Sequence, residues 1–375
     1  MTRSFAGLVR LMAVLVGLVG SGCAPATPPA LPSKAESRSV PTMTAPPAAT
    51  GPVATPPAAP PAEKLALRFG GAVTPPSLVH LPPYVAKAMG FFDEVGLDVT
   101  MVSFDGGLGA LRAANAGVDV AASSSDPLFA AVQNGVPMQA IGSYAARLSV
   151  VMMAAPQVAT PRQLKGHKIG IQEMGALNHV MSLLVLQEAG LSSSDVQWVN
   201  ISTANRVGSI VQGQTDAAVL HIDQYHAALA AHPELAVMAR LWEVAPDWWY
   251  AAFVASQDTI RTKREALVRF MTAVIKAQRF MYANPEQTKR IAVQETKIPA
   301  AAVDAAYDDL VRGGVWSVND GLPRQALENT LRKEAELGVV NPGNLPTYEQ
   351  LVDRSIADEA VQRNGGPWDD DPRWL

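Results

Sequence analysis

Short apolar runs alternate with helical patterns along most of the chain, and this alternation restricts the possible folds more than any other feature. Val118–Ala122 has the pattern of a strand and is followed by a helical pattern over Asp126–Asn134. Further along, Lys168–Gln172 and the helical pattern Ala176–Ala189 repeat this order. Strands joined by helices of this length form largely parallel sheets covered by helices. From Arg264 onward almost every pattern is helical, and one helix is expected over Tyr348–Ala357. The sequence therefore predicts two α/β lobes and a helical C-terminal part.

The N-terminus has the pattern of a secretory signal peptide. Met1–Arg10 contains two arginines and no acid, and Leu11–Gly20 is uncharged and apolar, which is too short to span a bilayer. Cys23 follows at the expected cleavage site, as in a bacterial lipobox, although Gly20 stands where the lipobox prefers leucine. Ordinary signal cleavage beside a bystander cysteine is the alternative. We predict a lipoprotein signal peptide over residues 1–22 and lipidation of Cys23.

A proline-rich segment follows the cysteine. Of the 39 residues from 24 to 62, 12 are proline and 11 are alanine. Proline fixes φ and has no N–H group, so this segment can form neither a helix nor the interior of a sheet. We predict that residues 23–63 are an extended tether between a lipid anchor and the folded domain. This arrangement predicts an extracytoplasmic domain that is anchored to the cell membrane.

The composition argues against several other classes of protein. Because Cys23 is the only cysteine, the chain can form neither an intramolecular disulfide nor a cysteine-rich zinc site. The formal charge of −4 argues against nucleic-acid binding, which favours a basic excess. The six histidines include no HxxxH pair, and no GxSxG, HExxH or SxxK motif occurs. We expect no metal, no cofactor, no catalytic residue and no nucleic-acid partner.

Five segments, met in order along the chain, carry a family resemblance. They are AKAMGFF with GLDV (86–92, 96–99), AANAGVDV (113–120), LKGHKIG (164–170), GALNH (175–179) and GQTDAA (213–218). They resemble ABC transporter substrate-binding proteins for nitrate, taurine and aliphatic sulfonates. The resemblance implies a type II periplasmic-binding-protein fold, in which two α/β lobes with two crossings between them enclose a ligand cleft. Lobe 1 would then comprise residues 64–146 and 249–375, and lobe 2 residues 147–248.

The resemblance also implies a function. A protein of this kind captures a small organic or anionic nutrient and, as a monomer, delivers it to the permease and ATPase of an ABC importer, without catalysis. Two alternatives stay open, namely an extracytoplasmic sensor without a transport role and an enzyme similar to thiamine-pyrimidine synthase. The sequence does not distinguish between a sulfonate, nitrate, a pyrimidine precursor, a flavin and an aromatic acid as the ligand.

The candidate ligand-binding residues directly follow predicted strands, because open α/β sheets bind ligands beyond the carboxyl ends of their strands. Each also has a plainer interpretation as a turn, a helix cap or a packed side chain. The candidates are Thr74, Ser77, His80, Gly106, Gly107, Ser123, Ser124, Ser125, Gly175, Ala176, Asn178, His221 and Trp249.

Residues near these candidates affect the expected ligand. We interpret Asp126 as the N-cap of a helix with Pro127 at its first position. Ala176 replaces the family's usual serine, and Asp223 stands where a proline is frequent. The pocket loops contain no arginine apart from Arg147, so a bidentate grip on a sulfonate or carboxylate is not evident. This absence favours a neutral or aromatic solute.

Overall fold

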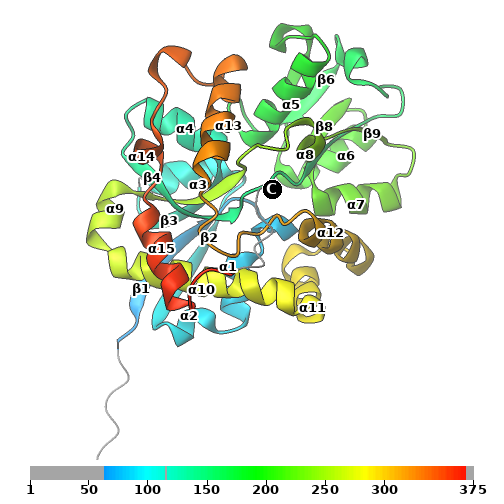
Figure 1. Ribbon diagram of the computed structural model, residues 1–375. Coiled ribbons are helices and arrows are strands. Elements are labelled where there is room, and N and C mark those ends of the chain that lie inside the picture. Colours follow the sequence, from blue (N-terminus) through cyan, green and yellow to red (C-terminus); the bar gives the residue numbers. More distant parts are fainter. Residues whose placement is uncertain (1–62, 115, 369–375) are drawn as a thin grey trace, which may run out of the picture. The chain divides into compact units, whose positions relative to one another are not determined.

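The computed structural model describes residues 63–114 and 116–368, and Figure 1 shows their elements. The predicted signal peptide, the lipidation site Cys23 and all but the last residue of the predicted tether lie outside the described residues. Among the residues that the structure describes, no helix combines the length and apolar character needed to cross a bilayer.

The first of two five-stranded sheets has the strand order β2-β1-β3-β10-β4. β1 pairs in parallel with β2 and β3, whereas β10 is antiparallel to both of its neighbours. The strands are β1 (Leu65–Gly71), β2 (Leu97–Ser103), β3 (Val120–Ser124), β4 (Met138–Ala145) and β10 (Ala251–Ser256). β10 therefore inserts between two strands that precede it by more than a hundred residues.

The second sheet has the order β7-β6-β8-β5-β9, again with parallel and antiparallel pairs. Its strands are β5 (Val150–Ala154), β6 (Lys168–Ile171), β7 (Gln197–Asn200), β8 (Ala217–His221) and β9 (Ala236–Arg240). All five residues of β5 and of β8 are buried. Burial on both faces explains why these strands read as continuous apolar runs rather than as alternating patterns.

The chain passes from the first sheet to the second between β4 and β5 and returns between β9 and β10. The predicted fold class, two α/β lobes of the type II periplasmic-binding-protein kind, is confirmed. The lobe boundaries at residues 146/147 and 248/249 stay a prediction. Below, "lobe 1" and "lobe 2" denote the parts built on the first and the second sheet.

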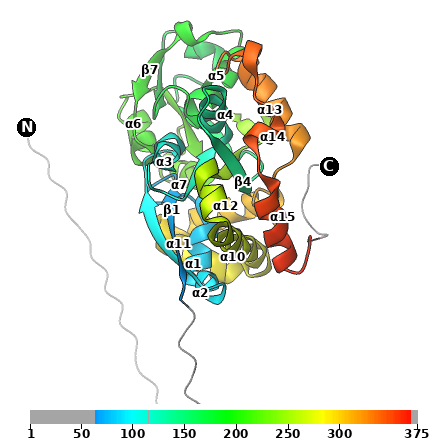
Figure 2. The ribbon, with the colours of Figure 1, turned by 90° about the vertical axis from the view of Figure 1, so that its left-hand side faces the viewer.

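Helices pack around both sheets (Figures 1 and 2). Lobe 1 carries η1 (Leu78–His80), α1 (Pro82–Ala88), α2 (Phe91–Glu94), α3 (Gly107–Ala114) and α4 (Ser125–Gln133). Lobe 2 carries η2 (Pro161–Leu164), α5 (Leu177–Glu188), η3 (Ser193–Asp195), η4 (Thr203–Asn205), α6 (Arg206–Val211), α7 (Ile222–Ala231) and α8 (Leu241–Val244). After β10 follow α9 (Gln257–Thr262), α10 (Arg264–Ala283), α11 (Pro285–Thr296), α12 (Ala300–Arg312), α13 (Arg324–Glu336), η5 (Pro342–Asn344), α14 (Tyr348–Leu351) and α15 (Arg354–Arg363).

Two local predictions are wrong. A single helix was expected over Tyr348–Ala357, but Val352 and Asp353 are extended and separate α14 from α15. Both residues bind the edge strand β4 instead, since Val352 bridges to Ala140 and the N–H of Asp353 donates to the Ala140 carbonyl at 2.9 Å. The expected N-cap role of Asp126 is also wrong, because α4 begins at Ser125 and Ser124 occupies the N-cap position.

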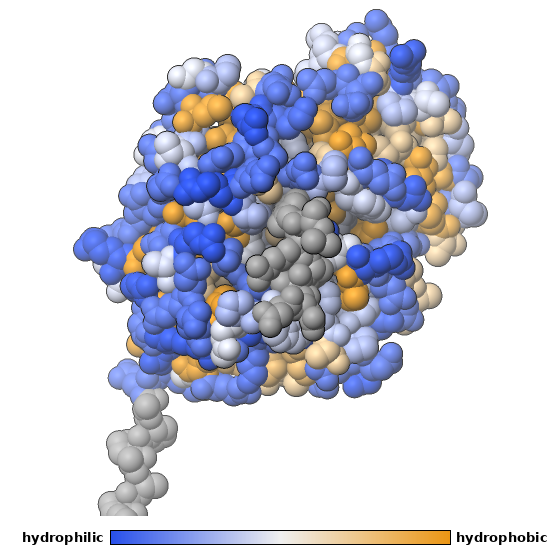
Figure 3. Space-filling model, viewed as in Figure 1, coloured by the Kyte–Doolittle hydropathy of each residue, from blue (hydrophilic) through white to orange (hydrophobic). Residues whose placement is uncertain are grey.

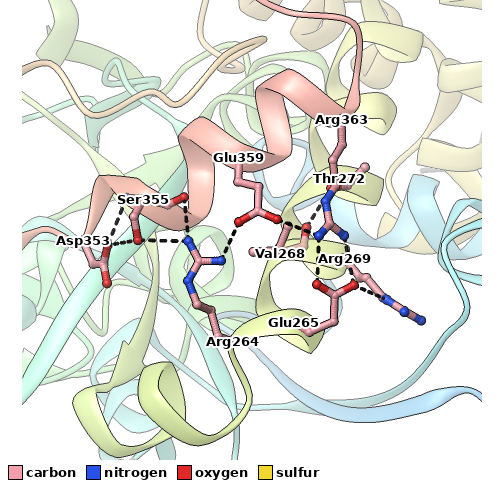
Figure 4. A network of polar contacts seen from close by, with 9 residues as sticks. All are labelled: Arg264, Glu265, Val268, Arg269, Thr272, Asp353, Ser355, Glu359 and Arg363. Carbon is pink, nitrogen blue, oxygen red and sulfur yellow. Dashed lines mark hydrogen bonds and ion pairs between the residues drawn. The ribbon is translucent and has the colours of Figure 1, made fainter.

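The C-terminal helix α15 lies along α10 and is joined to it by ion pairs (Figure 4). Arg363 makes two bonds to Glu265, at 3.0 and 2.8 Å, and a third to Glu359. Arg264 reaches from α10 to Glu359 as well. These side chains are partly exposed, and such pairs contribute little individually. Both helices also bury apolar side chains, and the burial of apolar area stabilises a fold more than exposed ion pairs do.

The surface shown in Figure 3 is mostly hydrophilic, with apolar residues in small separate areas. Among the described residues, the exposed large apolar side chains are Leu65, Met174 and Val211. Single exposed apolar side chains are normal on protein surfaces and do not by themselves indicate a binding area for a partner chain.

Candidate functional site

A small cavity lies where the two lobes meet. Its wall includes Gly106 after β2, Ser124 at the end of β3, Asn178 after β6 and His221 at the end of β8. These are carboxyl ends of strands, the position where open α/β sheets bind ligands. The volume of the cavity is about 30 Å³, which is room for only a few water molecules. In this arrangement of the lobes the cavity is therefore too small for an organic solute.

The structure brings seven of the predicted site residues to this cavity: His80, Gly106, Gly107, Ser124, Ala176, Asn178 and His221. They come from both lobes, as a cleft between lobes requires. They converge from five separate segments of the chain. Their contact with a ligand stays a prediction.

The other predicted residues lie elsewhere. Ser77, Ser123 and Ser125 are buried next to the lining residues without lining the cavity themselves, and Thr74 is exposed. Gly175 borders a neighbouring groove. Trp249 is fully buried against Phe129, and its indole N–H donates to the Gly321 carbonyl. The next residue, Tyr250, lines the cavity instead.

Two histidines face each other across the lobes with their rings 5.2 Å apart. His80 belongs to η1 in lobe 1, and its Nδ1 bonds to the Ser77 hydroxyl at 2.8 Å. Burial, assisted by the charge of Arg206, lowers the pKa of His80 to about 3. Burial also lowers the pKa of His221 well below its usual value. Both rings are therefore neutral at pH 7 and act as flat hydrogen-bonding walls rather than as cations.

Arg206 is a charged cavity residue that sequence reasoning missed. It is the first residue of α6, lines the cavity and is only 3% exposed. Its Nη1 donates to the Val219 carbonyl at 3.2 Å and its Nη2 to the Thr203 hydroxyl at 3.4 Å, whereas Nε has no partner. Burial lowers the pKa of Arg206 to about 10, so the group stays charged at pH 7.

This arginine corrects the interpretation that the pocket loops lack one. Among the described residues, no carboxylate lies within ion-pair distance of the Arg206 guanidinium (salt bridges are formed by other arginines). The charge of Asp105 acts on Arg206 only from beyond ion-pair distance. A buried charge without a direct counter-ion is costly, and an anionic group of a ligand would lower that cost. The sequence contained a pattern that could have identified Arg206. This residue begins a helix soon after β7, just as Asn178 lies in the first turn of the helix that follows β6.

Asn178 adds an unsatisfied amide to the same wall. Its side chain is 1% exposed, and neither its Nδ2 nor its Oδ1 has a partner. It stands at the start of α5, where backbone N–H groups are free. Since buried polar groups are nearly always paired in native proteins, this amide is suited to a ligand with both donor and acceptor atoms. His179, by contrast, serves its own loop, because its Nδ1 accepts the N–H of Gly175 at 3.1 Å.

Comparisons with known proteins agree with the fold described above. The family model described as NMT1/THI5 like matches residues 77–288. A Haemophilus influenzae protein, whose name assigns it provisionally to thiamine biosynthesis, is 27% identical over 231 residues, which is 60% of this chain and 71% of that protein.

Two solved structures show the same fold. The alkanesulfonate-binding protein of Xanthomonas axonopodis pv. citri, bound to MOPS, has a TM-score of 0.65 at 20% identity, covering 78% of this chain and 100% of that one. The periplasmic nitrate-binding protein of Synechocystis has a TM-score of 0.66 at 14% identity, covering 83% and 91%. Both neighbours are binding proteins rather than enzymes.

Proposed function

Because the chain belongs to the NMT1/THI5-like family, we propose that it is an extracytoplasmic solute-binding lipoprotein. It captures a small anionic solute between its lobes and delivers it to the permease and ATPase of an ABC importer. It works as a monomer, anchored to the membrane through the lipid on Cys23. The sulfonate and nitrate named for the two structural neighbours are both anions, which agrees with this solute class.

The observation that carries the proposal is the buried Arg206 guanidinium in the cavity wall, which has no partner at Nε and no carboxylate within ion-pair distance among the described residues. Its free Nε edge can donate to an oxyanion, and charge-assisted bonds of this kind are stronger than neutral ones. The amide of Asn178 and the neutral rings of His80 and His221 supply the remaining polar contacts. Tyr144 and Tyr250 add flat surfaces that suit the organic part of the solute.

A thermal-shift screen of the full chain tests the binding step. The probes are nitrate, methanesulfonate, MOPS and benzoate, each as the sodium salt, with benzamide as the neutral counterpart of benzoate and sodium chloride at equal ionic strength as the reference. A solute at a hundred times its Kd adds about 2.7 kcal/mol of stability, which is a visible shift. Arg206→Met should abolish the shift, and Arg261→Met, on the exposed helix α9, should leave it unchanged. If no anion raises the Tm, or if benzamide matches benzoate, the solute class is wrong.

The transport step is separated from the two alternatives by uptake. Cells that lack the gene should lose import of the labelled solute and regain it with the intact chain, but not with Cys23→Ala if the lipid anchor is needed. Unchanged uptake in the deletion strain would favour a sensor. An enzyme similar to thiamine-pyrimidine synthase would instead convert the bound solute, which mass spectrometry of the incubated protein would detect.

A further inference from the structure

Two carboxylates reach across the cleft, one from each lobe. Asp105 follows β2 in lobe 1, and its Oδ1 accepts the backbone N–H of Thr203 in lobe 2 at 3.1 Å. Asp223 lies in the first turn of α7 in lobe 2, and its Oδ2 accepts the backbone N–H of Leu78 in lobe 1 at 3.0 Å. The two bonds are reciprocal, because each lobe supplies one carboxylate and one backbone N–H group.

These bonds exist only while the lobes are together. Leu78 and Thr203 are first residues of 3₁₀ turns, and such N–H groups have no partner within their own turn. Leu78 is fully buried and Asp223 is 1% exposed, so their bond replaces contacts with water. Asp105 is exposed, and water can compete for its bond. The Asp223 bond should therefore contribute more to closure.

The lobe 1 carboxylate is also connected to the candidate anion site. The Thr203 hydroxyl accepts from the Gln172 amide at 2.6 Å and from Arg206 Nη2 at 3.4 Å. The same Gln172 amide lies 3.4 Å from Asp105 Oδ1. Asp105 therefore binds the backbone of Thr203, and the Thr203 side chain contacts the Arg206 guanidinium. Neither Asp105 nor Asp223 lines the cavity.

From this geometry we propose that Asp105 and Asp223 are positioning residues that hold the lobes closed without touching the solute. The protein then adopts the closed form part of the time before a solute arrives, because these two bonds favour it. A bound solute shifts the equilibrium between the open and closed forms further towards the closed form. Another link between the lobes in this region, the ion pair of Arg112 with Glu173 at 3.1 Å, is largely exposed and cannot replace them. The proposal concerns closure alone and holds whatever the solute is.

Single-molecule fluorescence transfer in the full chain tests it without any solute. Cys23→Ser removes the native thiol, and dyes are placed at Asn134→Cys and Glu188→Cys, which are exposed at the far ends of α4 and α5. We expect Asp223→Ala to lower the ratio of closed to open molecules about tenfold and Asp105→Ala about threefold, as the loss of charged hydrogen bonds predicts. Asp→Asn at either position should restore part of the ratio, because the amide oxygen still accepts an N–H.

Hydrogen exchange separates this role from general destabilisation. Asp223→Ala should speed exchange in the peptide around residues 77–81, and Asp105→Ala in that around 202–206, while the sheet strands keep their protection. Asp98→Ala, an exposed carboxylate within β2, should change neither measurement. Asp105 is exposed, so its alanine variant can be read even where Asp223→Ala unfolds, and Asp223→Asn then reports on the second bond. An unchanged closed-to-open ratio in Asp105→Ala and in Asp223→Ala, or in Asp105→Ala alone where Asp223→Ala unfolds, would overturn the proposal. That result would leave the solute screen unaffected.

Discussion

Two buried carboxyl groups should make the stability of this protein fall as the pH rises. Asp126 in α4 and Glu334 in α13 are both fully buried, and none of their four oxygens has a hydrogen-bond partner of regular geometry. Burial raises the pKa of Asp126 to about 7. Burial and the charge of Asp126 raise the pKa of Glu334 well above its usual value. At pH 7 the pair therefore keeps at least one proton, mainly on Glu334.

The sign and size of the effect follow from linkage. A raised pKa in the folded state means that stability is fully present below the unfolded value of 3.8 and is lost as the pH rises towards about 7. Between pH 5 and pH 8, the ionisation of Asp126 alone should remove roughly 2–3 kcal/mol from the free energy of unfolding. That is a large share of the roughly 5–15 kcal/mol that stabilises a typical domain.

Asp126→Asn isolates this contribution, because asparagine has the same shape and does not titrate. Urea unfolding of the variant at pH 5, 6, 7 and 8 should show a flatter pH profile than that of the parent chain, and the variant should be the more stable protein at pH 8. Asp98→Asn, on an exposed position of β2, is the control and should follow the parent profile. If the Asp126→Asn and parent profiles run parallel from pH 5 to pH 8, the buried pair does not titrate as argued.

Three further substitutions test packing and surface pairing. Gly321 has φ +65°, and a Cβ there would lie 2.6 Å from Ser143 Cβ, so Gly321→Ala should cost roughly 2–4 kcal/mol; an unchanged urea midpoint would contradict this. Trp249→Phe removes the 2.9 Å bond to the Gly321 carbonyl and should cost roughly 1–3 kcal/mol in the same assay, with no effect on the solute shift. Arg363→Ala opens the network on α15, and the loss should stay below about 1 kcal/mol and shrink in 1 M salt. A larger, salt-independent loss would show that Arg363 acts through packing.

The strand ends could be predicted from the sequence because both sheets are buried between helices. Apolar runs such as those of β5 and β8 can be identified as strands from the sequence alone. The residues that follow parallel strands lie at the same edge of the sheet. This logic placed His80, Asn178 and His221 at one cavity. It could not choose between Trp249 and Tyr250, because neighbouring side chains before β10 point in different directions and only the packing of Phe129 decides which of them is enclosed.

The role of Asp126 shows a different limit. Aspartate before proline is a frequent helix start, but here Ser124 ends a buried strand and takes the N-cap position first. Asp126 is therefore the second residue of α4, on the side towards α13, a helix some two hundred residues later in the chain. A pairing of that kind depends on tertiary contacts that no local pattern contains.

The charge of the candidate site is likewise decided by burial rather than by composition. His80, His221 and Arg206 would count as up to three cations if they were exposed. Desolvation lowers the pKa of both imidazoles, so they are neutral at pH 7. It also lowers the pKa of the guanidinium, but the ordinary pKa of arginine is so high that Arg206 stays charged. One fixed positive charge in a cavity with room for only a few water molecules matches a monoanion. A dianion such as phosphate would bury a second, uncompensated charge, at a cost that neutral histidines cannot offset. The proposed solute is therefore a singly charged sulfonate, nitrate or carboxylate rather than a phosphate.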